Sequence, residues 1–124
     1  MTVFDLLGIA AAGGLGAVVR FLAGALPHRR PVRATILVNL AASLLAGALT
    51  GLLVVDESWR AVLVTGFCAG LSTYSAFAVQ AVEQLEGRRG GHALATLAAT
   101  VVGGALAASA GLLIGGLLMP ATPV

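Results

Sequence analysis

Four hydroxyl side chains follow one another inside an otherwise apolar, charge-free stretch of the chain, Ser72, Thr73, Tyr74 and Ser75. They lie within residues 61–82, a stretch long enough to cross a bilayer at about 20 residues per crossing. Consecutive helical positions point to every side, so four hydroxyls in a row cannot all hide on one face. Some of them must face protein, water or an ion, and we expect the function to lie here.

The residues around these hydroxyls suggest two kinds of ion chemistry. Gly66 and Gly70 weaken helix continuity, and the carbonyls freed at a break in a spanning helix often coordinate a cation. Tyr74 and Phe77 are three positions apart, so on a helix they share a face. Because an aromatic ring has a positive edge, two rings presented edge-on could hold an anion. The alternative is that both rings simply pack, but the neighbouring hydroxyls favour the first interpretation.

Two further polar side chains fall within apolar segments, and each allows two interpretations. Asn39 could make an interhelical hydrogen bond of about 0.6–2 kcal/mol, or donate to an anion from a pore wall, and its position favours neither. Arg20 could extend towards the membrane surface or hold a fixed positive charge beside a vestibule. The first is the commoner behaviour of an arginine near a helix end.

The composition indicates the elements that must position these residues. Hydrophobic residues make up 59% of the chain, charged residues 10%, and the mean hydropathy is +1.03. These values exclude an ordinary soluble domain. We predict an all-α integral membrane protein, with residues 1–124 forming a single four-helix membrane domain whose third helix is broken. The expected spans are about residues 3–26, 34–55, 61–82 and 93–119.

Small or short side chains recur at four-residue steps in the second and fourth spans. The two series are Asn39, Ser43, Gly47 and Gly51, and Gly103, Ala107, Gly111 and Gly115. Such steps let helix backbones approach closely in a membrane. Spacing does not tell packing within the chain from packing between subunits, but the small interior of four such helices favours an oligomer.

The arginines predict the orientation of the chain. The loops after the first and third spans hold five of the seven basic residues, Arg29, Arg30, Arg33, Arg88 and Arg89. The opposite side has Arg60 only, next to Asp56 and Glu57. The positive-inside rule therefore predicts a plasma-membrane protein with these two loops in the cytoplasm and both termini outside.

The polar residues argue against two other classes of membrane protein. A proton-coupled exporter needs a carboxylate within a span, whereas Asp5 is near the terminus and Glu83 and Glu86 are at a loop edge. An intramembrane enzyme needs a base or metal ligands beside its nucleophile. His28 and His92 both fall at loop edges, so we predict that the chain is not an enzyme.

Three motifs resemble those of one family, the small fluoride channels called Fluc or CrcB. Residues 66–77, Gly66-Phe-Cys-Ala-Gly-Leu-Ser-Thr-Tyr-Ser-Ala-Phe77, resemble the family signature G-F-C-G-G-[LFW]-T-T-F-S-T-F. Gly13-Gly14-Leu-Gly16-Ala17-Val-Val-Arg20 is similar to G-G-x-G-A-x-x-R, and Thr35-Ile-Leu-Val-Asn39-Leu40 to G-T-L-x-x-N-L. The length and the four spans agree too, so the resemblance covers nearly the whole chain.

The resemblance implies a passive fluoride-selective channel that exports fluoride from the cytoplasm and lowers its toxicity. Members of this family are antiparallel dimers with dual topology and two pores, each lined by both chains. A structural Na⁺ at the dimer centre would be bound by the backbone carbonyls of Ala69 and Ser72. A polar track on the fourth span corresponds to Thr96 and Thr100. The expected fluoride path is lined by Asn39, Ser72, Thr73, Tyr74, Ser75, Phe77, Thr100 and Arg20.

The chain departs from the signature at four positions, Ala69, Ser72, Tyr74 and Ala76. Ala69 stands where the family has glycine, and the alanine would strain the backbone if this position needs a positive φ. The arginine bias also favours a single orientation in the membrane. We therefore hypothesise one half of a heterodimer with a paralogous subunit of opposite orientation, with a homodimer left open. The rival hypothesis is a non-conducting or partly degenerate subunit of such a heterodimer.

Overall fold

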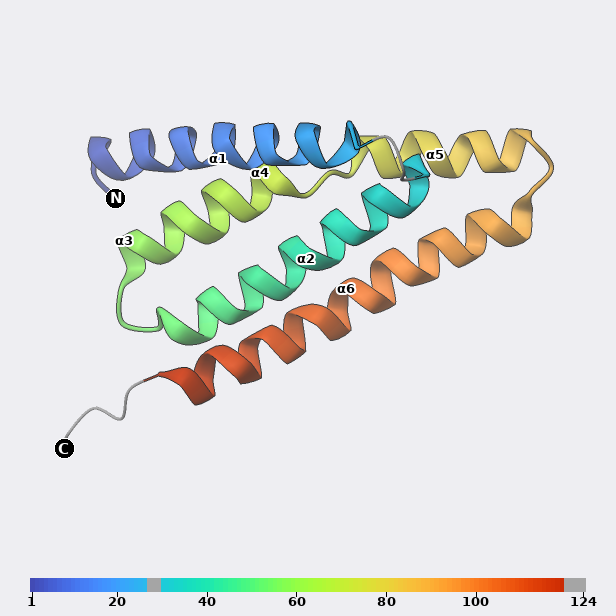
Figure 1. The fold of residues 1–124 in the computed structure, drawn as a ribbon. Coiled ribbons are helices and arrows are strands. Elements are labelled where there is room, and N and C mark those ends of the chain that lie inside the picture. Colours follow the sequence, from blue (N-terminus) through green and yellow to red (C-terminus); the bar gives the residue numbers. More distant parts are fainter. Residues whose placement is uncertain (27–29, 120–124) are drawn as a thin grey trace.

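A computed structural model describes residues 1–26 and 30–119, and within these ranges the chain forms helices and no strand (Figure 1). Four helical segments of this part are long and apolar enough to cross a membrane, which confirms the predicted all-α membrane architecture. The elements are α1 (Val3–Gly24), α2 (Pro31–Leu52), α3 (Glu57–Arg60), the π-helix η1 (Ala61–Cys68), α4 (Ala69–Leu71), α5 (Ser75–Glu86) and α6 (Gly90–Leu118).

Local sequence explains where several helices begin. The Thr2 hydroxyl accepts from the Asp5 backbone N–H at 3.2 Å while the Asp5 carboxylate accepts from the Thr2 N–H at 2.7 Å, a reciprocal cap on α1. Pro31 opens α2, where its missing N–H costs no helical hydrogen bond. Asp56 caps α3 by accepting from the Trp59 N–H at 3.1 Å. The second, third and fourth spans begin at Pro31, Glu57 and Gly90, a few residues before the predicted positions 34, 61 and 93.

The third span, Glu57–Glu86, is composite and contains the predicted break. It passes from α3 through η1 to α4, leaves helical geometry at Ser72 (φ −75°, ψ 158°), and resumes as α5 at Ser75. Ala69 has ordinary right-handed torsions, φ −67° and ψ −38°. The prediction that Ala69 strains the backbone is therefore wrong, because the break is made by the extended Ser72 and not by a left-handed residue at position 69.

The helices pack mainly in two pairs, α2 on α6 and α1 on η1 and α4. A Cβ on Gly47 would collide with the Ala108 carbonyl, and one on Gly111 with the Leu44 carbonyl. The glycines of the two four-residue series therefore serve packing within the chain, between α2 and α6.

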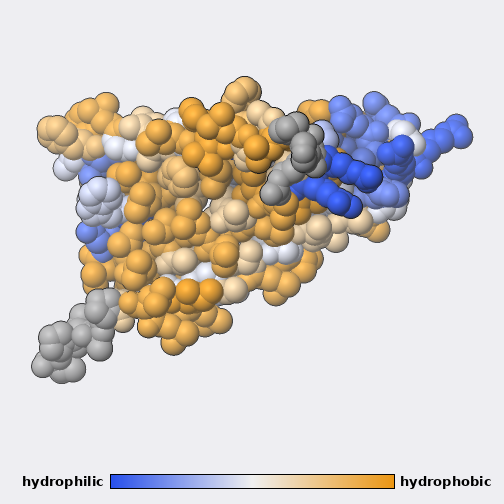
Figure 2. Space-filling view, in the orientation of Figure 1, coloured by the Kyte–Doolittle hydropathy of each residue, from blue (hydrophilic) through white to orange (hydrophobic). Residues whose placement is uncertain are grey.

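The interior is small, as expected for a four-helix membrane bundle. Most of the buried apolar residues in the described part of the chain are alanines, and the two largest are Leu71 and Phe77. Most of the large apolar side chains lie on the outside, where they form a broad hydrophobic surface (Figure 2). That surface suits contact with lipid or with another membrane chain.

Candidate functional site at the break in the third span

Asn39 of α2 holds the break through both ends of its side chain. Its Nδ2 donates to the Thr73 carbonyl at 3.1 Å, and its Oδ1 accepts from the Thr73 backbone N–H at 2.8 Å. The side chain thus replaces the helical partners that Thr73 loses at the break. Unsatisfied backbone groups at membrane depth cost several kcal/mol each, so this pairing makes the break tolerable. Of the two interpretations of Asn39, the interhelical hydrogen bond is the one that the structure contains.

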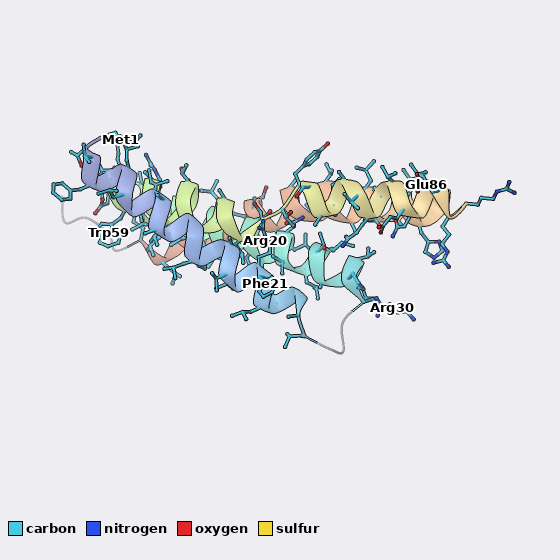
Figure 3. All side chains as sticks on the ribbon, turned by 90° about the horizontal axis from the view of Figure 1, so that it is seen from above. Met1, Arg20, Phe21, Arg30, Trp59 and Glu86 are labelled. Atoms are coloured by element: carbon cyan, nitrogen blue, oxygen red, sulfur yellow. The ribbon has the colours of Figure 1, made fainter. Side chains whose placement is uncertain are left out.

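Arg20 brings a positive charge to the same break. Its Nη1 donates to the Ser72 carbonyl at 3.0 Å, and the side chain is partly buried. Figure 3 labels Arg20 beside the end of the α4 ribbon, well away from the end of the bundle marked by Arg30. The guanidinium therefore turns into the protein and does not extend to the membrane surface. A charge held at this depth is costly and is usually kept for a function.

The hydroxyl run mostly serves the backbone around the break. Ser72 Oγ donates to the Ala69 carbonyl at 3.2 Å. Thr73 Oγ1 accepts from the Ala76 N–H at 3.3 Å and lies 3.4 Å from Ser75 Oγ. Three of the four hydroxyls are thereby engaged in local contacts. The Tyr74 hydroxyl makes no hydrogen bond within the described part of the chain.

Tyr74 and Phe77 lie near each other but face different surroundings. Their ring centroids are 6.1 Å apart and the ring planes are tilted by 51°. Phe77 is 9% exposed, whereas Tyr74 is 80% exposed. An outward tyrosine at membrane depth leaves its hydroxyl to be satisfied by something outside this chain.

A cavity of about 330 Å³ adjoins the break and is lined by polar groups from three helices, among them Arg20, Thr35, Thr73, Ser75 and Gln80. Its lining contains no carboxylate. Gln80 Nε2 donates to Thr35 Oγ1 at 2.9 Å, which ties α5 to α2. Gln80 Oε1 is buried and has no partner among the described residues. The cavity therefore offers a positive charge and hydroxyl groups with no competing negative charge.

A second, shallower hollow of about 220 Å³ lies against the other side of the break and is lined in part by Ser43, Ala69 and Ser72. The Ala69 carbonyl accepts the Ser72 hydroxyl, and the Ser72 carbonyl accepts Arg20. Each carbonyl oxygen keeps a second lone pair that could bind a hard cation, but a cation at the Ser72 carbonyl would also meet the positive charge of Arg20. Two oxygens are few for such an ion, and further ligands would have to come from outside this chain.

Thr96 and Thr100 of α6 differ in their hydrogen bonds. Thr96 is buried, and its Oγ1 donates to Gln84 Oε1 at 3.0 Å, which fastens α6 to α5. Thr100 Oγ1 is buried without a partner among the described residues, and Thr100 does not line the cavity beside Arg20. Thr96 is thus committed to helix packing, and only Thr100 keeps a free hydroxyl.

The family described as "CrcB-like protein, Camphor Resistance (CrcB)" matches residues 7–112 of the chain. The chain belongs to the CrcB family. It is 48% identical over 89 residues to "Fluoride-specific ion channel FluC" of Thermococcus gammatolerans, covering 66% of this chain and 72% of that one. It is 41% identical over 102 residues to "Fluoride-specific ion channel FluC 2" of Rhodococcus jostii, covering 81% and 89%. It is 38% identical over 130 aligned residues to "Fluoride-specific ion channel FluC 1" of Leifsonia xyli subsp. xyli, covering 99% and 95%.

The structure of this CrcB protein brings some of the predicted site residues together and separates others from them. Hydrogen bonds join Asn39 to Thr73 and Arg20 to Ser72, and Ser75 lines the cavity beside them. Within this chain, Tyr74 points outwards and Thr100 is set apart from that cavity. Gln80 was not among the predicted site residues, although an amide two residues before the end of the predicted third span was a visible signal.

Proposed function

We propose that this CrcB protein is a subunit of a fluoride-specific ion channel that lets fluoride leave the cytoplasm passively and so confers fluoride resistance. The observation that carries the proposal is the cavity beside the break, which joins Arg20 to hydroxyl and amide groups and has no carboxylate in its lining. Fluoride is a small anion that accepts strong hydrogen bonds, so such donors suit it. The names of the relatives support the same activity.

We assign the fluoride path to the donors and aromatic ring edges around the break. Asn39 Nδ2 has a second hydrogen beyond the one given to Thr73, and the guanidinium of Arg20 has further N–H groups beyond the one given to Ser72. Ring edges are positive and could take over the anion where polar donors end. The assigned residues at the break are Arg20, Asn39, Ser72, Thr73, Tyr74, Ser75 and Phe77, and the unpaired hydroxyl of Thr100 on α6 is assigned to a more distant part of the path.

A second chain is part of the proposal. Tyr74 and Ala69 are exposed at the break whereas Phe77 is buried, so a single copy leaves the surface of the break uncovered at Tyr74 and Ala69. An antiparallel subunit, either a second copy or a paralogue of opposite orientation, would cover that surface. We propose that the loops after α1 and α5 face the cytoplasm and the termini face outwards, since the loops carry most of the arginines. Arg29 and His28 of the first loop lie outside the described residues.

The activity is tested by fluoride efflux from liposomes that contain only this purified chain. Efflux with chloride retained is the expected result for a homodimer, and efflux only after a paralogue is added would indicate a heterodimer. Phe77→Ile keeps an apolar side chain but removes the ring edge, so we expect it to abolish efflux. Phe4→Ile changes an 85% exposed ring near the start of α1 and serves as the control. Wild-type efflux from the Phe77 variant would instead favour a scaffold role for this chain.

We also propose a structural Na⁺ at the Ala69 and Ser72 carbonyls, shared with the second chain. An ion that binds only the folded dimer raises its stability as the ion concentration rises. Thermal unfolding of the purified protein should therefore shift upwards in Na⁺ salts relative to N-methylglucamine salts of equal ionic strength. Equal unfolding temperatures in the two salts would contradict the sodium site without touching the fluoride proposal.

A further inference from the structure

Four described arginines gather at one end of the molecule, outside the site at the break. Arg30 and Arg33 belong to the start of α2, Arg88 and Arg89 to the turn between α5 and α6, and all four are exposed. Figure 2 shows strongly hydrophilic residues gathered at this end, and Figure 3 places Arg30 and Glu86 there, opposite Met1 and Trp59. Among the described arginines, only Arg20 and Arg60 donate hydrogen bonds through their side chains. The side chains of the four arginines at this end thus make no hydrogen bond within the described residues.

The lengths of the helices create a step at this end. The third and fourth spans have 30 and 29 residues, whereas α1 and α2 have 22 each. At about 1.5 Å per residue the longer pair is roughly 10 Å longer, more than a hydrocarbon core of about 30 Å requires. Figure 1 shows α5 continuing past the end of α1 and the start of α2. The turn between α5 and α6 therefore extends beyond the ends of α1 and α2, far enough to reach the headgroups of a bilayer that these two helices span.

A notch lies between the start of α2 and this projecting turn. It has a volume of about 290 Å³ and is lined in part by Val32, Glu83, Gly87 and Arg89. Exposed apolar side chains lie elsewhere on the surfaces of α5 and α6, namely Val79, Val82, Leu85, Leu94 and Leu97. A lipid at this end would therefore have charged groups at its headgroup and apolar helix surfaces within reach of its acyl chains.

We propose that the notch binds the phosphate headgroup of an anionic phospholipid. Arginine binds phosphate through a planar fork of N–H donors; Arg89 lines the notch, and Arg30 and Arg33 are close in sequence to Val32, the residue of α2 that lines it. Within the notch the charges of Arg89 and Glu83 offset each other, and the surplus comes from the whole end, where four arginines against Glu83 and Glu86 leave a net charge of +2 on the described residues. That surplus selects an anionic lipid over a zwitterionic one. The binding is independent of fluoride conduction and of the site at the break.

The test uses the full chain reconstituted in liposomes with trace spin-labelled lipids. Electron paramagnetic resonance gives the association of labelled phosphatidylglycerol relative to labelled phosphatidylcholine at the protein surface. The wild type should prefer phosphatidylglycerol. In the double variant Arg30→Gln/Arg89→Gln at low salt, the ratio of phosphatidylglycerol to phosphatidylcholine association should fall by about fivefold for each arginine replaced. Arg60→Gln, which alters the residue next to Trp59 at the opposite end of the bundle, should keep the wild-type ratio.

Each alternative result would overturn the proposal. Equal association of the two lipids with the wild type would mean that no anionic site exists. Equal association of phosphatidylglycerol and phosphatidylethanolamine would mean selection by headgroup size and not by charge. A loss in Arg60→Gln as large as in the double variant would mean diffuse attraction to the whole surface. A salt titration provides a further test that needs only the wild type. Its preference for phosphatidylglycerol should weaken as ionic strength rises, and a preference that does not change with salt would contradict a charged site.

Discussion

Asn39→Asp is expected to reduce fluoride efflux by about a hundredfold or more while leaving the helices in place. The substitution preserves the shape of the side chain but replaces the Nδ2 donor with a carboxylate oxygen that faces the Thr73 carbonyl. One hydrogen bond becomes a repulsion between two acceptors, and the new negative charge stands in the proposed path of an anion. A loss of about 3 kcal/mol corresponds to about a hundredfold, and a charged group left unpaired at a buried position reaches that size.

The measurement is efflux from liposomes at neutral pH, with each variant first compared with the wild type by gel filtration. Thr50→Val is the matched control, because it removes a hydroxyl from α2 whose 2.7 Å hydrogen bond goes to Ala46 of the same helix. That variant should conduct like the wild type. If Asn39→Asp elutes as the wild type does and conducts at the wild-type rate, Asn39 has no part in the conducting path.

The break in the third span could be predicted from sequence because its cause is local. Hydroxyl residues that follow glycines in an apolar segment are poorly accounted for by a continuous helix, whichever way the segment is turned. The means by which the backbone breaks could not be predicted. A left-handed residue at position 69 and an extended residue at position 72 both interrupt a helix, and the structure uses Ser72.

The partners of the polar side chains depend on how the helices cross, and sequence spacing does not carry that information. Asn39 and Thr73 are 34 positions apart, and Arg20 and Ser72 are 52 apart. The sequence predicted both Asn39 and Arg20 as candidates because they are polar residues in apolar segments. It favoured extension of Arg20 to the membrane surface, since nothing in α1 itself indicates that a carbonyl of another helix lies within reach.

The contacts of α5 with α2 and α6 support the site, and sequence spacing did not predict them. Gln80 bonds Thr35 at 2.9 Å and Gln84 bonds Thr96 at 3.0 Å, so two amides of α5 hold it to both neighbouring helices. Thr96 and Thr100, four apart, predicted a shared face and a shared role. The structure gives Thr96 a packing role because a glutamine of α5 lies opposite it, and no regularity within α6 could reveal that.

Gly111→Val is expected to prevent the chain from folding into a monodisperse protein. A Cβ at Gly111 would collide with the Leu44 carbonyl and stand 2.8 Å from the Ala48 backbone nitrogen, so α6 would have to move away from α2. Backbone atoms cannot give way as side chains do, and overpacking of this kind costs about 1–3 kcal/mol or more. Because α2 also carries Asn39, a shift of this pair would disturb the hydrogen bonds that hold the break.

Gly116→Val is the matched control, since it adds the same side chain to the same helix where nothing lies within 4 Å of the added Cβ. The two variants share the loss of helix propensity that valine brings, so a difference between them reports packing alone. We expect Gly116→Val to be purified in wild-type yield and Gly111→Val to aggregate or to unfold at a much lower temperature. Equal yields and equal unfolding temperatures would mean that α2 and α6 do not depend on this close approach. That outcome would also remove the basis for assigning the glycines of the two four-residue series to packing within one chain, and would return them to the interface between subunits.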